Sequence, residues 1–190
     1  FPTANGVACE TKLVYQGGHD FGDGGVPYGD RFSGAQGNRK VEAWLEVKNG
    51  QEQGLGVPLP AGRVRVSKLD PADGSLEFIG EDRIDHTPRN ETLHLKLGNA
   101  FDVVGERKQT DFRIDLARKT MSEEIEIRIR NRKAVPVKVL VKENLYRWTN
   151  WRIATSTHTF DKQDSRTILI PVSAGADQEA VVKYTVRYSW

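Results

Sequence analysis

Cysteine is nearly absent from this chain of 190 residues, which has only Cys9. A single thiol cannot form an internal disulfide, and it cannot supply a structural zinc site with the several ligands it needs. Long apolar runs are missing as well. The hydrophobic runs are only a few residues long, whereas a membrane-spanning helix needs roughly 20 such residues, so we expect no transmembrane segment.

An excess of charge of one sign is also missing. The chain has 28 Lys and Arg residues against 26 Asp and Glu residues, a formal net charge of +2. Nucleic-acid-binding domains usually carry a concentrated basic stripe, so we predict no nucleic-acid partner. Because 37% of the residues are hydrophobic, the chain can bury a core, which excludes a disordered protein.

Catalytic motifs are absent too: the sequence has no G-x-S-x-G elbow, no phosphate-binding glycine loop and no His-Glu-x-x-His motif. Asp82, Asp85 and His86 lie close in sequence, and a carboxylate beside a histidine can perform acid–base chemistry. On a strand, however, Asp82 and His86 share one face while Asp85 lies on the other. No partnered nucleophile is visible, and His94 and His158 lack ligand-like spacing. We therefore predict no enzyme, no cofactor and no metal site.

What the sequence does contain is an almost continuous alternation with a period of two. Residues 124–130 alternate charged residues with three isoleucines, which predicts a strand with isoleucines inward and charges in water, available for cross-strand pairing. Similar patterns cover residues 41–48, 63–66, 93–97 and 181–188. Residues 145–153 fit a strand or a short helix. Pro171 cannot donate to a sheet, so its strand is expected at an edge or with a bulge.

About a dozen short strands at this spacing predict an all-β protein built from antiparallel β-sandwiches. A weak internal repeat supports two of them. Residues 45–66 read as a strand, an Asn turn, a proline and a second strand, and residues 127–139 repeat that order. We predict two tandem immunoglobulin-like sandwiches, over residues 1–107 and 108–190, that meet near Gly105 to Thr110.

A glycine-rich loop interrupts the first predicted sandwich at residues 17–37, which hold eight of the 18 glycines. A loop of about 20 residues is usually functional or disordered. Its acidic residues suggest calcium, but the D-x-D-x-D-G spacing is absent. We expect Phe21, Tyr28 and Phe32 to anchor the loop on a protein partner, because ordering it is otherwise costly.

Three aromatic residues within a span of six form a second candidate surface: Tyr146, Trp148 and Trp151. Exposed rings in a row seat protein partners or stack on sugars. We expect Tyr146 and Trp148 to contribute to partner binding. A protein partner is the first expectation and a glycan the second.

Three long motifs resemble a bacterial cell-envelope family. They are GLGVPLPAGRVRV at 54–66, DGSLEFIGEDRIDHTP at 73–88 and LGNAFDVVGER at 97–107. The family is known as a domain of unknown function, and some members are called mucoidy-inhibitor-like proteins. The resemblance runs from about Val41 to Trp190 and implies a mainly β, exported protein with no established reaction. It also implies that Phe1 is a processed or trimmed start. In the family, the equivalent of residues 151–153 resembles a buried strand start, which implies that Trp151 is a core residue.

From these observations we expect a non-enzymatic exported interaction or structural module of the bacterial cell envelope, located in the periplasm or outside the cell. An accessory subunit permanently docked in a larger envelope or membrane-associated complex is the first alternative. A carbohydrate-binding module or an uncharacterised enzyme is the second. The sequence does not identify the partner.

Overall fold

The computed structural model describes residues 4–18, 27, 29–32 and 37–190. These residues form an all-β protein, as predicted, and the helical part of the described chain is one short turn, η1 (Gln51–Gln53). The strands in the described residues are β1 (Cys9–Gln16), β2 (Lys40–Lys48), β3 (Gly62–Leu69), β4 (Leu76–Ile84), β5 (Thr92–Asp115), β6 (Thr120–Asn131), β7 (Val137–Asn144), β8 (Trp151–Ser156), β9 (Asp161–Lys162), β10 (Thr167–Ala174) and β11 (Glu179–Ser189).

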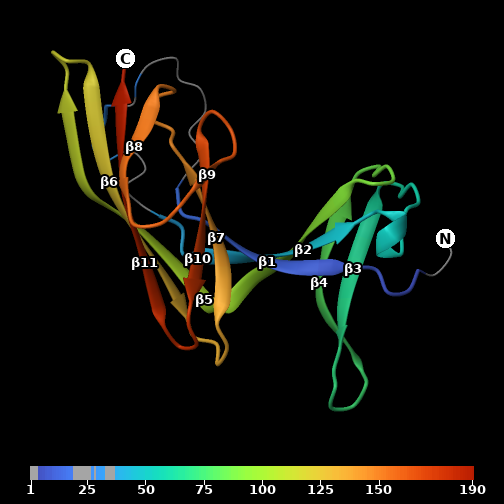
Figure 1. The fold of residues 1–190 in the computed structure, drawn as a ribbon. Coiled ribbons are helices and arrows are strands. Elements are labelled where there is room, and N and C mark those ends of the chain that lie inside the picture. The colour runs from blue at the N-terminus through green and yellow to red at the C-terminus, as the bar shows by residue number, and fades with distance from the viewer. Residues whose placement is uncertain (1–3, 19–26, 28, 33–36) are drawn as a thin grey trace. The chain divides into compact units, whose positions relative to one another are not determined.

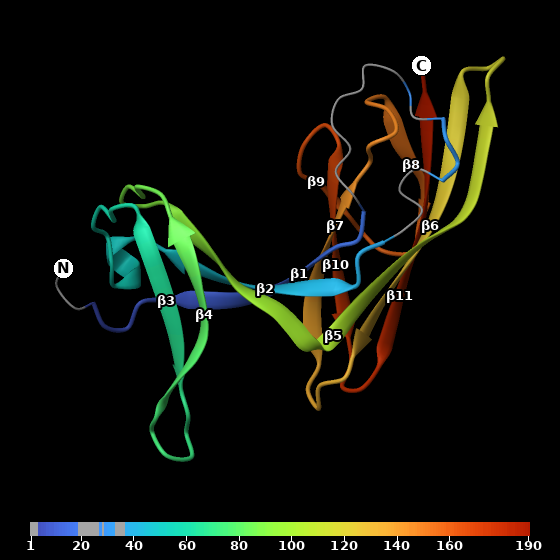
Figure 2. The ribbon, with the colours of Figure 1, turned by 180° about the vertical axis from the view of Figure 1, so that it is seen from behind.

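The strands form a large sheet and a small one (Figure 1). The large sheet has the order β8-β11-β6-β5-β2-β1-β7-β10-β9, and β3 pairs with β4 in the small sheet. Seen from behind, β11 lies between β6 and β8 (Figure 2). Side chains of β7 and β11 meet in the core even though four strands separate them in the sheet order, since Tyr184 donates a hydrogen bond to Glu143. The sheet must therefore curve back on itself there.

The chain divides into two compact units at places other than residue 107. Unit 1 contains residues 1–13 and 42–99, and unit 2 contains residues 14–41 and 100–190. The expected junction near Gly105 lies inside the continuous strand β5. Gly105 serves packing there, because a Cβ atom at this position would lie 2.0 Å from the ring of Tyr15. A glycine in this strand therefore marks a close approach rather than a linker.

Strand periodicity predicts the inner and outer faces correctly. Ile125, Ile127 and Ile129 on β6 are fully buried. Pro171 on β10 pairs with Leu140 on β7, and it lies beyond the two residues of β10 that pair with β9, so β10 is an edge strand at this position, as predicted. The short-helix alternative for residues 145–153 is wrong, because this segment forms a turn followed by β8.

Two buried asparagines give the internal repeat a physical basis, and the first, Asn49, follows β2. Its Nδ2 donates to the carbonyl oxygens of Val57 and Pro88 at 2.7 and 2.8 Å, and its Oδ1 accepts from the Gly56 N–H at 3.1 Å. The side chain thus ties the turn after its own strand to a second turn. That second turn contains Asn90, which has a φ of 69°.

The second, Asn131, ends β6 and repeats these contacts in unit 2. Its Nδ2 donates to Val135 and Gly175 carbonyl oxygens, both at 2.8 Å, and its Oδ1 accepts from the Lys133 N–H at 2.9 Å. Asp177, two residues after Gly175, has a φ of 48°, just as Asn90 follows Pro88 by two residues. Each unit is therefore locked by one buried amide that bridges two turns.

Replacement of either asparagine by aspartate tests this account. A carboxylate cannot donate to the two carbonyl oxygens, so Asn49→Asp and Asn131→Asp should each lower the free energy of unfolding by about 1–3 kcal/mol or more. Hydrogen exchange should show lost protection mainly in the unit that carries the change. The control is Asn99→Asp at an exposed strand position, which should cost no more than about 0.5 kcal/mol. Equal losses in both units from a single change would contradict the account.

Candidate binding site

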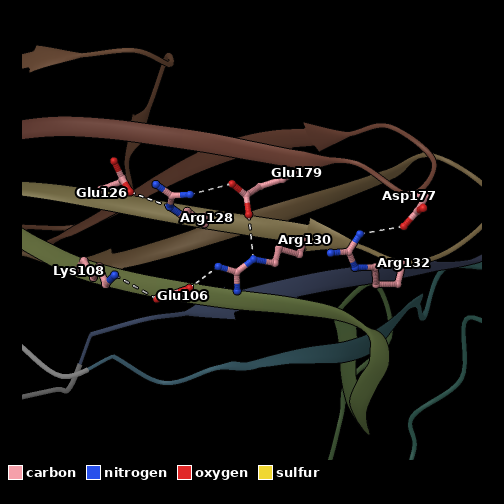
Figure 3. Close-up of polar contacts among 8 residues, drawn as sticks. All are labelled: Glu106, Lys108, Glu126, Arg128, Arg130, Arg132, Asp177 and Glu179. Atoms are coloured by element: carbon pink, nitrogen blue, oxygen red, sulfur yellow. Dashed lines mark hydrogen bonds and ion pairs between the residues drawn. The ribbon is translucent and has the colours of Figure 1, made fainter.

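The outer face of β5, β6 and β11 carries a ladder of ion pairs (Figure 3). Arg130 hydrogen-bonds Glu106 on β5 and lies 2.8 Å from Glu179 on β11. Arg128 lies 3.1 Å from Glu179 and 2.7 Å from Glu126. The hydrogen bond from Arg130 lowers the pKa of Glu106. In this part of the face each positive charge has a negative neighbour, as the sequence predicts for cross-strand pairs.

Farther along the same strands, not every arginine is paired with a carboxylate. Arg152 on β8 lies directly opposite Arg187 on β11, Arg187 lies opposite Ser122 on β6, and Ser122 lies opposite Arg113 on β5. Directly opposed residues of antiparallel strands have their side chains on the same face. We call these four residues the arginine row, and its three arginines are exposed.

Two members of the arginine row form no ion pair with the part of the chain that the structure describes. Asp111 holds Arg113, with 2.7 Å between the Arg113 Nε and the carboxylate. Within the described ranges, neither Arg152 nor Arg187 has an ion-pair partner. Like charges directly opposite each other on a sheet are destabilising, so this pair favours an anion between the two guanidinium groups.

A cleft of about 490 Å³ lies over the arginine row. Its charged lining consists of the three arginines and Asp115, which together carry a net charge of +2. Hydrogen-bonding side chains also line it: Ser122, Thr120, Asn150 and Ser189. The volume lies in the range of small-molecule sites, roughly 300–1,000 Å³. The cleft is therefore large enough for a ligand, and its charge suits an anionic one.

Beneath this face, unit 2 buries charged groups that pair with one another. The Arg107 Nε donates to Glu143 at 2.9 Å, and the Tyr184 hydroxyl donates to the same carboxylate oxygen. Burial alone would lower the pKa of Arg107, but the charges of Glu143, Tyr184 and Glu123 and the hydrogen bond to Glu143 together outweigh it and raise that pKa. Burial, followed by the charge of Glu143, raises the pKa of Tyr184.

A second buried pair joins Arg147 to Glu123, 3.2 Å apart. Arg147 also donates to the Gln109 side chain at 2.9 Å and to the Asp30 carbonyl oxygen at 2.8 Å, and it stacks 4.3 Å above the ring of Phe112. The arginine is fully buried. These contacts hold the Arg147 side chain within the core.

The aromatic residues predicted to bind a partner differ in their exposure to solvent. Phe21 and Tyr28 lie outside the described residues. Phe32 is 79% exposed, in a turn where its N–H binds the Asp30 side chain. Tyr146 is only 2% exposed, so it is a core residue instead of a partner contact, because its ring lies beside the buried Arg147.

Trp148 is half-buried, and so is Trp151, which was expected in the core. The Trp151 Nε1 donates to the Ser165 carbonyl oxygen at 2.7 Å, and the Lys162 ammonium lies 4.9 Å from its ring centroid. Trp151 also contributes to the lining of the cleft. The two tryptophans thus remain partly accessible at the start of β8.

The described residues of the glycine-rich segment contact their own unit. The Asp30 and Arg31 carbonyl oxygens accept from Arg147 and Gln109. Gly17 and Gly37 lie against Arg107, where an added Cβ would come within 3.0 and 2.8 Å of that side chain. The ends of the segment therefore cover the buried charges. Contact of this segment with another chain stays a prediction.

Asp82 and His86, which form the acid–base candidate in the sequence, accept hydrogen bonds from backbone N–H groups. Asp82 accepts from the Lys96 N–H at 2.8 Å, and His86 Nδ1 accepts from the Ala61 N–H at 3.3 Å. The structure brings no three metal-ligating side chains together among the residues it describes. None of the described helical residues could cross a membrane, since η1 is a single short turn.

Sequence reasoning missed the arginine row. Arg113 and Arg152 are far apart in the chain, and Arg187 is farther still. Each arginine is an ordinary polar residue in an alternating strand. Only the strand order and register place the three side by side, so the available signal was their common outward phase within three strand patterns.

Comparison with known proteins finds no matching family model, no matching curated protein and no matching solved structure. The function therefore has to be argued from the side chains of this chain and from their arrangement in space.

The buried carboxylate Glu143 leads to a test with a closely matched control. Tyr184→Phe removes a hydrogen bond to a buried charge and should lower the free energy of unfolding by about 1–3 kcal/mol. Tyr188 is equally buried, but its hydroxyl has no hydrogen-bond partner within the described residues. Tyr188→Phe removes a buried hydroxyl that makes no such hydrogen bond, so it should leave the free energy of unfolding unchanged or raise it. Chemical denaturation measures both, and similar losses would contradict this view of Glu143.

The buried tyrosines also predict a loss of stability at alkaline pH. Burial raises the pKa of Tyr184 and of Tyr188 above the ordinary value of about 10. The folded state then holds protons that the unfolded state releases, so stability is complete below about pH 10 and falls as pH rises toward the raised pKa. Tyr188→Phe should make that fall less steep in denaturation curves recorded at successive pH values. An unchanged slope would contradict the prediction.

Proposed function

We propose that this protein is a non-enzymatic, exported binding module of the bacterial cell envelope, and that it binds an anionic partner in the cleft over the arginine row. The observation that carries the proposal is the pair Arg152 and Arg187, opposed on neighbouring strands with no compensating carboxylate among the described residues. The other basic residues of that face pair with carboxylates, so these two arginines mark a place where an external anion would add stabilisation.

The location rests on the resemblance of residues 54–107 to an exported envelope family. Two tandem immunoglobulin-like sandwiches remain the proposed architecture of the two units. The repeated contacts of Asn49 and Asn131 support it, because they place the same amide bridge in each unit.

A non-catalytic role is supported by the use made of the ionisable groups. Arg107 and Glu143 satisfy each other within the core, and Asp82 and His86 accept backbone hydrogen bonds. General acid–base catalysis requires such groups within reach of a substrate. In the cleft, by contrast, the charged groups are mainly arginines, which suit anion recognition better than proton transfer at neutral pH.

The hairpin of β3 and β4 favours the second candidate, an accessory subunit of a larger complex. Leu69 and Leu76 lie opposite each other near its turn and are 60% and 73% exposed, and Phe78 is 61% exposed. Exposed apolar residues grouped in this way are typical of protein contacts. The protein partner predicted from the sequence would dock here rather than at Tyr146.

Anion binding is tested with inorganic pyrophosphate at constant ionic strength. Wild-type protein should melt at higher temperature as pyrophosphate is added, with a stabilisation of about 1.4 kcal/mol at ten times the dissociation constant. The double variant Arg152→Gln, Arg187→Gln should lose this response. Without pyrophosphate, it should be at least as stable as the wild type, because the repulsion between the two charges is gone.

The matched control is Arg89→Gln, which removes one exposed arginine in unit 1. It should leave the response to pyrophosphate intact. An equal loss in the control, or an undiminished response in the double variant, would show that the anion does not act through the cleft.

A further inference from the structure

We infer that the cleft over the arginine row binds an acidic saccharide chain, in which anionic groups are separated by hydroxyl-bearing rings. This inference rests on the proposed function and names its ligand. The arginine row crosses four hydrogen-bonded strands in the order β8, β11, β6 and β5. At about 4.8 Å per strand the row is roughly 14 Å long. It therefore suits an extended ligand with more than one anionic group.

In the cleft, the positive charge is confined to this single row of side chains. On one side, Thr120 lies opposite both Ser189 and Asp115. The Asn150 Nδ2 donates to the Ser189 hydroxyl at 2.8 Å. Successive rows on one face lie about 7 Å apart along the strands. Hydroxyl, amide and carboxylate groups therefore border the arginines on this side.

On the other side the next row has the same character. Thr185 lies opposite Thr155 on β8 and Glu124 on β6, and Glu124 lies opposite Asp111 on β5. The two threonine hydroxyls hydrogen-bond each other at 3.0 Å. The arginine row is thus bordered on both sides by carboxylates and by hydroxyl groups.

These borders decide between two kinds of polyanion. A dense polyanion such as DNA carries a charge about every 1.7 Å, and its charges would lie close to Asp115, Glu124 and Asp111. A sugar ring has hydroxyl groups that donate to carboxylates and accept from amides and hydroxyls. The arginines form paired hydrogen bonds with carboxylate or sulfate groups of the same saccharide chain. Wide anion spacing and hydroxyls between the anions thus complement this surface.

The test is a calorimetric and NMR titration of the full chain with four probes at about 0.15 M ionic strength. They are an oligogalacturonate of four sugars, the galacturonate monomer, the neutral maltotetraose and inorganic tripolyphosphate. The oligogalacturonate should bind at least about tenfold more tightly than each of the others. It should also shift the amide resonances of Ser122, Arg152 and Arg187.

Two variants separate the contributions of charge and hydroxyls. Arg187→Gln should weaken oligogalacturonate and tripolyphosphate binding alike, by about tenfold. Thr185→Val keeps the β-branched shape but loses the hydroxyl, so it should weaken oligogalacturonate by a few-fold and leave tripolyphosphate unchanged. Arg89→Gln is the control for net charge and should change neither affinity.

The outcomes distinguish this inference from the proposed function. Tripolyphosphate binding as tight as oligogalacturonate binding, abolished by Arg187→Gln, would overturn the saccharide and leave the anion-binding module standing. Equal binding of maltotetraose would overturn the requirement for an anion. If no probe binds and the melting temperature is insensitive to pyrophosphate, both proposals fail.

Discussion

The pairing of buried charges in unit 2 is the constraint on which the rest of this unit depends. Arg107 and Arg147 are withdrawn from water, which is costly for an isolated guanidinium, and Glu143 and Glu123 supply the compensating charges. Removal of one partner from such a pair typically costs about 3–5 kcal/mol, because the other charge remains buried. Arg107 and Glu143 come from β5 and β7, so their ion pair requires those strands to face each other. The ends of the glycine-rich segment and the turn after β7 are held against the same charges.

The two faces of β6 and its neighbours have different electrostatic roles. On the inner face, each guanidinium has a carboxylate partner beside a hydrophobic core that includes Ile125 and Ile127. On the outer face, the charged side chains drawn in Figure 3 pair with one another, whereas Arg152 and Arg187 form no ion pair with the described residues. The register of β8 and β11 places Arg152 and Arg187 directly opposite each other on the outer face. An anion that binds there meets two positive charges on neighbouring strands.

Much of the fold could be predicted from the sequence, and the reason is local. The alternation at residues 124–130 depends on which residues bury apolar area, and the structure buries all three isoleucines. The repeat of strand, asparagine, turn and proline also had a real physical basis in the amide bridges of Asn49 and Asn131. The expected division at residue 107 differs from the two compact units, and it took Gly105 as part of a junction. In the structure this glycine lies mid-strand under the ring of Tyr15.

The candidate site was beyond the reach of local patterns. The sequence by itself determined an all-β chain, the inward and outward phases of its main strands and the absence of recognised catalytic motifs, because these follow from side-chain type and spacing along the chain. Only the tertiary structure decided that Tyr146 is buried beside Arg147, and that Arg113, Arg152 and Arg187 form one row. These facts depend on strand order and register, which are set by long-range packing and pairing. Three arginines distributed between positions 113 and 187 are unremarkable in sequence. They become a site when three strands align them on one face.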